Sequence, residues 1–200
     1  MKFIIATNNS KKLIELERIL NPLGIDAVTA KQEGISLDDV EENGKTFKEN
    51  SFIKAYAACS KSGLPAIADD SGICVDALNG EPGIFSARFG GEGATDIDKN
   101  NLILDKLKNE NDRGAHYTCA ITCVFPNGDT IQAEDYCLGE IAMRPEGTGG
   151  FGYDPIFLYD GKSFGCYSAE EKDKVSHRGK ALRKFKTELI KYLEERNVKQ

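Results

Sequence analysis

The sequence predicts an α/β fold built on a mixed β-sheet with flanking helices. In the first half of the chain, short apolar runs typical of strands are separated by segments with helical periodicity. In the middle, two long strand-like segments, residues 116–125 and 130–142, are joined by the turn at residues 126–129. Strands linked through helices tend to pair in parallel and hairpin strands pair antiparallel, so we expect a mixed sheet.

The N-terminal segment predicts a strand, a turn and a helix. Residues 3–6 are apolar and read as a strand, and residues 7–10 form a polar turn. A second strand is expected at residues 25–30, before a polar, acidic loop at residues 31–45. The helix between the two strands has a buried stripe with helical spacing, made of Leu13, Leu16, Ile19, Leu20 and Leu23.

The second helix has clear start and stop signals. Thr46 and Glu49 form a T-x-x-E capping box at its beginning, and Gly63 and Pro65 mark its end. Residues 65–69 and 72–78 then read as two strands.

A third helix is expected after Thr95. In the last third of the chain, residues 154–159 read as a short strand. Ser168 with Glu171 forms a further capping box, and Ser176 has the character of an N-cap for the final helix.

Composition narrows the class of protein. A chain of 200 residues with 40% apolar content suits one globular domain over residues 1–200, or two closely packed lobes, and no separable linker is visible. The net charge of −6, with both signs interspersed, argues against a nucleic-acid partner. Because no apolar run approaches the ~20 residues of a membrane span and no signal peptide is visible, we expect a cytoplasmic protein without membrane contact. Six cysteines without a C-x-x-C motif are read as reduced thiols.

Two predicted helices carry positive side chains in their first turns. Lys11 and Lys12 occupy the start of the first helix, and His177 and Arg178 occupy the start of the last. Cations are disfavoured there by the helix dipole, by about 0.3–1 kcal/mol each. Exposed lysines tolerate this at little cost, so a solvated surface is the plain alternative. An anion such as a phosphate chain, bound at the helix starts, would reverse the sign of the penalty.

An acidic pair supplies candidate ligands for the Mg²⁺ that accompanies phosphate chains. Asp69 and Asp70 follow an apolar strand, and consecutive strand residues point to opposite faces, so one of them should face a ligand. Spacing does not say which one, and Asp-Asp-Ser-Gly is also good turn chemistry. Glu41 and Glu42 in the acidic loop are further candidates, with a solvated loop as the alternative.

A glycine-rich segment, residues 147–152, is the third constellation. Its glycines let a ligand approach the backbone closely, and Phe151 and Tyr153 add flat aromatic surfaces on which a base can stack. A tightly packed hairpin or bulge is the structural alternative.

Together and in this order, these motifs resemble the inosine triphosphate pyrophosphatase family, whose members hydrolyse ITP, dITP and XTP to the monophosphate and pyrophosphate. The resemblance runs nearly end to end. Position 8, often glycine in relatives, is Asn8 here. The matching motifs are T-x-N-x-x-K at Thr7, Asn9 and Lys12; E-x-x-x-T-F-x-E-N at Glu42, Thr46, Phe47, Glu49 and Asn50; A-D-D-S-G at residues 68–72; F-G-Y-D-P at residues 151–155; and S-H-R at residues 176–178.

The resemblance implies a role for each motif. Glu41 and Asp70 would bind Mg²⁺, and Asp70 would also act as the base for the attacking water. Phe151 would stack on the base of the nucleotide. The other implied substrate contacts are Thr7, Asn8, Asn9, Ser10, Lys11 and Lys12 for the triphosphate; Ser71; Gly152, Tyr153 and Asp154 lining the base pocket; and Lys172, His177 and Arg178 reaching the base and its neighbouring polar groups.

The resemblance also implies an elongated two-lobed fold around a long mixed sheet, a central substrate cleft and a homodimer. Hydrogen-bond donors of His177 and Arg178 would pair with the 6-keto group of a base such as hypoxanthine and would disfavour adenine, which has a 6-amino donor there. Two other functions remain open on the sequence. One is a pyrophosphatase for modified pyrimidine triphosphates, and the other is a nucleotide-binding module without activity.

Overall fold

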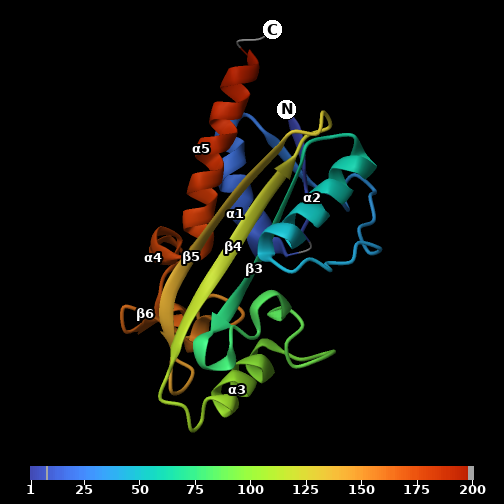
Figure 1. Cartoon of the computed structure of the whole chain (residues 1–200). Helices are drawn as coiled ribbons and strands as arrows, with labels where there is room; N and C mark the ends of the chain where they lie inside the picture. Colours follow the sequence, from blue (N-terminus) through green and yellow to red (C-terminus); the bar gives the residue numbers. More distant parts are fainter. Residues whose placement is uncertain (8, 198–200) are drawn as a thin grey trace. The chain divides into compact units, whose positions relative to one another are not determined.

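The computed structural model describes residues 1–7 and 9–197, and at Lys11 and Asn197 it describes the backbone only. Over these residues the chain forms an α/β fold, as predicted (Figure 1). Its helices and strands are β1 (Lys2–Ile5), α1 (Ser10–Leu20), β2 (Asp26–Thr29), α2 (Phe47–Ser62), β3 (Ala66–Val75), α3 (Asp96–Lys106), β4 (Gly114–Val124), β5 (Thr130–Ile141), β6 (Phe157–Tyr159), β7 (Lys162–Ser163), α4 (Ala169–Val175) and α5 (His177–Asn197).

The strands form one mixed sheet in the order β2-β1-β3-β4-β5-β6-β7. β1 pairs in parallel with β2 and with β3, and helices α1 and α2 supply the connections that parallel pairing needs. At the other end of the order, β5–β6 and β6–β7 pair antiparallel. The turn between β4 and β5 closes as the sequence predicts, with the Phe125 N–H donating to the Asp129 carbonyl at 2.9 Å.

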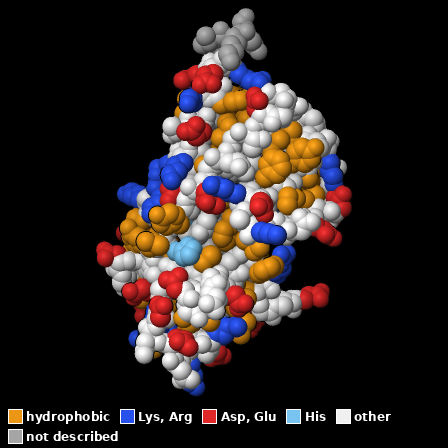
Figure 2. All heavy atoms as spheres, in the orientation of Figure 1, with side chains coloured by type: hydrophobic (Ala, Val, Ile, Leu, Met, Phe, Trp, Pro, Cys, Tyr) orange, Lys and Arg blue, Asp and Glu red, His pale blue; other side chains and the backbone are white. Residues whose placement is uncertain are grey.

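The chain divides into two compact units. Unit 1 comprises Met1–Asp70, Ala120–Glu134 and Ala181–Gln200, and unit 2 comprises Ser71–Cys119 and Asp135–Lys180. The chain passes from one unit to the other inside β3, β4, β5 and α5. Figure 2 shows acidic and basic side chains intermixed on the face that it displays. None of the described helices has the length and apolar character of a membrane span.

The core of unit 1 has an apolar layer on each face of the strands. On one face, Ile4 and Ala68 pack with Ala55 and Ala58 of α2. Side chains alternate along a strand, so Phe3 points to the opposite face, where its ring meets Phe125 at 5.9 Å. Phe125 in turn stacks on Tyr192 of α5 at 4.2 Å.

The predicted boundaries of α2 are confirmed. The Thr46 hydroxyl accepts a hydrogen bond from the Glu49 N–H at 3.1 Å, and Gly63 ends the helix in the left-handed conformation.

The core of unit 2 is built around aromatic rings. Tyr117 lies 4.7 Å from Phe157, and Phe157 lies 5.0 Å from Phe164, measured between ring centroids. Ile103 of helix α3 and Leu107, which follows as its C-cap, are both fully buried in this cluster. The capping box predicted at Ser168 is confirmed at the start of α4, and a further capping box joins Thr95 with Asp98 at the start of α3. All six cysteines are free thiols, as expected.

The prediction of two separate strands, residues 65–69 and 72–78, is wrong, because β3 runs without interruption from Ala66 to Val75. Gly72 serves close packing and not a turn, since a Cβ at this position would collide with the Gly83 carbonyl and the Ser86 side chain. Ser86 secures the strand, and its hydroxyl accepts from the Ile73 N–H at 3.0 Å.

The strand predicted at residues 154–159 is shorter than expected. Residues 154–156 form a 3₁₀ turn with Pro155 in its first turn, and only residues 157–159 pair in the sheet.

Candidate functional site

The T-x-N-x-x-K motif folds into a hydrogen-bonded turn at the start of α1. The Asn9 N–H donates to the Thr7 hydroxyl at 3.1 Å, and the Asn9 side-chain carbonyl accepts from the Lys12 N–H at 3.3 Å. Asn9 is therefore the N-cap of α1, and Lys12 lies in the first turn as predicted. Ser10 is exposed in the same turn. Asn8 and the side chain of Lys11 lie outside the described residues.

Lys12 has a counterion within unit 1. Its ammonium lies 2.9 Å from an Asp69 carboxylate oxygen, and the two side chains are only 17% and 4% exposed. Helix polarity alone suggested that the charge of Lys12 is balanced by a bound anion. In the structure Asp69 balances part of that charge and holds the lysine in place, and the binding of an anion by Lys12 stays a prediction.

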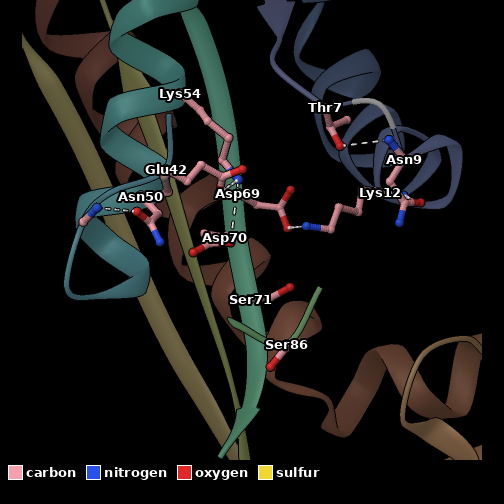
Figure 3. Close-up of polar contacts among 12 residues, drawn as sticks. Thr7, Asn9, Lys12, Glu42, Asn50, Lys54, Asp69, Asp70, Ser71 and Ser86 are labelled. Atoms are coloured by element: carbon pink, nitrogen blue, oxygen red, sulfur yellow. Dashed lines mark hydrogen bonds and ion pairs between the residues drawn. The ribbon is translucent and has the colours of Figure 1, made fainter. Parts of the chain in front are cut away.

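Asp69 and Asp70 point to opposite faces of β3, as strand alternation requires (Figure 3). Asp69 faces Lys12 of α1, whereas Asp70 faces α2. The Lys54 ammonium of α2 lies 2.8 Å from Glu42 and 3.6 Å from Asp70. One cation thus joins two carboxylates that are far apart in the sequence.

The environment of Asp70 suits a base. Burial and the negative charge of Glu42 raise the pKa of the Asp70 carboxyl, although Lys54, Asn50 and Lys12 oppose the rise. Its second oxygen, Oδ2, is buried and has no hydrogen-bond partner among the described residues. Burial works against the charge of Lys54, but the Asp70, Asp69 and Glu42 carboxylates outweigh it and raise the pKa of the ammonium. Lys54 is therefore a cation at neutral pH.

The donor set around Asp70 fits a small divalent cation. Glu42 and Asp70 already share one positive group, and the Oδ2 atom of Asp70 is left for a further ligand. Mg²⁺ needs only one or two carboxylates and completes its octahedron with water and phosphate oxygens. Among residues 1–7 and 9–197, no group of three or more His, Cys, Asp or Glu side chains is placed to hold a metal ion.

The two glutamates of the acidic loop differ in position. Glu42 is the one linked to Asp70 through Lys54. Glu41, which the family resemblance implied as the metal ligand, is exposed in the loop.

The F-G-Y-D segment is tied together by Asp154 in unit 2. The Asp154 carboxylate is 2% exposed, accepts from the Phe151 N–H at 2.8 Å and lies 2.6 Å from the Lys172 ammonium. Lys172 is also 4.8 Å from the centroid of the Phe151 ring, over its face. Tyr153 is buried and donates its hydroxyl hydrogen to the Ser86 carbonyl at 2.8 Å. Tyr153 is therefore an anchor of the segment, whereas Phe151 is partly exposed.

His177 and Arg178 begin α5 and are both buried, so the alternative of a solvated surface is wrong for them. The His177 ring stacks on Tyr117 at 4.4 Å with an angle of 7° between the planes. The Arg178 guanidinium donates to the Ser71 hydroxyl at 2.8 Å and lies 5.8 Å from the Phe151 ring. Ser176 caps this helix as predicted, accepting from the Gly179 N–H at 3.1 Å.

Sequence reasoning missed Lys54 and Tyr117 and gave no role to the side chain of Asn50. A signal for α2 was present, because Asn50 and Ser51 interrupt the stripe formed by Phe47, Ala55 and Ala58 and are themselves buried. Polar residues on the apolar face of a helix need partners inside the protein. Tyr117 gave no such signal, since an aromatic residue in an apolar strand is ordinary core.

Comparison with known proteins places these motifs in a family. A model of the Ham1 family matches residues 3–188. A dITP/XTP pyrophosphatase of Nitrosomonas europaea is 46% identical over 185 residues, covering 90% of each chain. One of Desulfotalea psychrophila is 44% identical over 199 residues, covering 96% of this chain and 88% of the relative. The solved structure of a HAM1 protein from Coxiella burnetii superposes with a TM-score of 0.89 at 38% identity, covering 96% of this chain and 99% of that one. The chain therefore belongs to the Ham1 family.

Proposed function

We propose that this protein hydrolyses the triphosphates of non-standard purine nucleosides, ITP, dITP and XTP, to the monophosphate and pyrophosphate. The observation that carries the proposal is the environment of Asp70, a buried carboxylate with a raised pKa and an oxygen that has no hydrogen-bond partner among the described residues. Such a group takes a proton from water more readily than an ordinary aspartate. The names of the curated relatives support the substrate class.

The residues of unit 1 would bind the triphosphate and activate water. Lys12, held by Asp69, and Lys54, held by Glu42, present two fixed cations, and the start of α1 offers backbone N–H groups to phosphate oxygens. In the reaction the anhydride bond between the α and β phosphates breaks, and the oxygen of water forms the new bond to phosphorus. Asp70 accepts the proton of that water, and pyrophosphate leaves.

Glu42 and Asp70 would hold Mg²⁺, with Glu42 replacing Glu41 as the proposed ligand because Glu42 is the glutamate joined to Asp70 through Lys54. When bound, the ion shields the negative charge of the phosphates and increases the acidity of nearby water. Fixed cations and a fixed base contribute mainly by positioning and by electrostatic stabilisation, which is typical of phosphoryl-group chemistry.

The residues of unit 2 would recognise the base. Phe151 would stack on it, and the donors of Lys172, His177 and Arg178 would face its polar edge. A 6-keto group accepts hydrogen bonds, whereas the 6-amino group of adenine donates them, so buried donors would lose their partners with ATP. On the resemblance to the family we also expect a cytoplasmic homodimer with no nucleic-acid partner.

A substrate panel tests the proposal. Pyrophosphate release is measured for ITP, XTP, dITP, GTP, ATP and UTP, with and without Mg²⁺, and the nucleotide product is identified. We expect release from the first three and little from the others, and only with Mg²⁺. A preference for pyrimidine triphosphates would favour the alternative pyrophosphatase. Tight ITP binding without release would indicate a binding module.

Two matched variants in neighbouring residues test which glutamate binds the metal. Glu42→Gln and Glu41→Gln remove the same charge from the same loop. We expect only Glu42→Gln to raise the Mg²⁺ concentration needed for half-maximal activity, by tenfold or more on the scale of lost metal-ligand contacts, roughly 10–100-fold. An effect of Glu41→Gln alone would return the assignment to Glu41, and equal effects of the two variants would contradict the choice of Glu42 over Glu41.

A further inference from the structure

The backbone of Gly152 is held at both polar groups by side chains of α3. The Gly152 N–H donates to Asp96 Oδ2 at 2.8 Å, and the Gly152 carbonyl accepts from the Asn100 amide at 3.1 Å. Asp96 and Asn100 are four residues apart, so they lie on the same face of the helix. Gly152 has a φ of +62°, a conformation that other residues rarely adopt. Two fixed contacts on one glycine therefore define how the segment bends here.

Asp96 and Asn100 take no part in the capping box of their own helix. Thr95 and Asp98 form the capping box of α3, so the first turn is stabilised without Asp96. Asn100 is 4% exposed, although it is polar and lies only three residues before the buried Ile103. Its amide nitrogen is bonded to the Gly152 carbonyl, whereas its Oδ1 atom is buried without a hydrogen-bond partner among the described residues. A buried amide costs stability unless it is bonded, so the contact with Gly152 gives a reason for its presence.

Gly152 lies between Phe151, the residue proposed to stack on the base, and Tyr153, the anchor of the segment. Phe151 is partly exposed, whereas Tyr153 is buried and bonded to the Ser86 carbonyl. Asp154 then closes the segment back onto the Phe151 N–H. The position of the Phe151 ring thus depends on the Asp154 contact and on the two contacts from α3.

We propose that Asp96 and Asn100 are positioning residues that set base selectivity by holding Gly152, and through it the Phe151 ring. The inference rests on the proposed function, because it assumes that the segment contacts the base. Contacts of this kind fix a binding group to within about 0.5 Å, and small displacements at a recognition site lower affinity and discrimination. Neither residue touches the base itself.

Substitutions at Asp96 separate this role from a general loss of stability. Asp96→Ala removes the acceptor for the Gly152 N–H, whereas Asp96→Asn retains an acceptor oxygen without the charge. Asp98→Ala is the matched control, because it removes a carboxylate from the same helical turn that contacts Thr95 and not Gly152. The measurements are kcat and KM for ITP and ATP, with thermal unfolding of each variant.

We expect Asp96→Ala to raise KM for ITP by about tenfold and to lower the ratio of kcat/KM for ITP over ATP, with kcat within about twofold of wild type. Asp96→Asn should recover most of the loss. Asp98→Ala should lower the unfolding temperature and leave the KM and the ratio unchanged. The inhibition constant of tripolyphosphate, which has no base, should be the same in all four proteins.

Three results would overturn the inference while the proposed function stands: an Asp96→Ala enzyme with wild-type KM and selectivity, failure of Asp96→Asn to recover them, or an equal change in Asp98→Ala. An Asp96→Ala variant that fails to fold is replaced by Asn100→Ser, which removes the donor to the Gly152 carbonyl and for which the same rise in KM at near-normal kcat is required. A wild-type protein that releases no pyrophosphate from ITP would overturn both proposals.

Discussion

Replacing Asp70 by asparagine tests the proposed base, and saturating Mg²⁺ in the assay offsets the loss of a proposed metal ligand. The change keeps the size of a side chain that is only 12% exposed, and it removes the negative charge and the ability to accept a proton. A positioned general base contributes about 10²–10⁴-fold, and tenfold in rate corresponds to about 1.4 kcal/mol. We therefore expect kcat for ITP to fall by at least ~100-fold, which is about 2.7 kcal/mol of transition-state stabilisation.

The assay is steady-state pyrophosphate release from ITP at saturating Mg²⁺, with binding of ITP measured separately. Lys12 and Lys54 remain in the variant, so we expect it still to bind the nucleotide. Near-normal turnover by Asp70→Asn would refute the assignment of Asp70 as the base.

The Asp70→Asn variant should also differ from wild type in how its free energy of unfolding depends on pH. The folded protein raises the pKa of Asp70 above its ordinary value of 3.8, chiefly through burial, so the folded state favours the protonated form. The contribution of the Asp70 carboxyl to the free energy of unfolding is fully present below about pH 3.8 and is lost as the pH rises through the raised pKa. Asparagine is neutral throughout, so with EDTA present we expect Asp70→Asn to gain stability over wild type as the pH rises towards 7. Urea unfolding between pH 4 and 7 measures it, and a difference in unfolding free energy between the two proteins that does not shift in favour of the variant as the pH rises would contradict it.

Three further predictions concern single contacts. Arg178→Ala removes the donor that meets Ser71, and we expect the ratio of kcat/KM for ITP over ATP to fall by about tenfold; an unchanged ratio would exclude Arg178 from base selection. Thr46→Ala removes the N-cap of α2 and should lower the free energy of unfolding in urea by about 0.5–2 kcal/mol, whereas Thr187→Ala, on the exposed surface of α5, should change it by less than about 0.5 kcal/mol. Gly147→Ala should cost more than Gly161→Ala in the same assay, because both glycines have φ near +75° but only at Gly147 would a Cβ collide with backbone atoms of Gly165; equal costs would show that backbone conformation alone matters.

Features determined by neighbouring residues were predictable from the sequence. The caps at Thr46, Ser168 and Ser176 and the turn at residues 126–129 each depend on hydrogen bonds within a few positions, and all four are confirmed. The mixed sheet followed from the same local signals, because the type of connection decides whether strands pair in parallel or antiparallel.

Features determined by distant contacts were not predictable in this way. β3 continues through Gly72 because Ser86 packs against it, and nothing in Asp-Asp-Ser-Gly itself indicates that neighbour. Alternation along the strand predicted that Asp69 and Asp70 diverge, but their partners, Lys12 and Lys54, come from two different helices. For the same reason, sequence spacing did not distinguish Glu41 from Glu42.

The chain passes between the two units within four elements, β3, β4, β5 and α5. This arrangement affects how the protein folds and where it can be truncated. Unit 1 draws on three separate stretches of sequence, and its last stretch includes Phe185 and Leu189 of α5, both completely buried. Its interior is thus complete only once α5 has packed onto residues that precede it by more than a hundred positions, so this closure depends on long-range contacts. A truncation ahead of residue 181 would open the layer beneath α5 instead of trimming a dispensable tail.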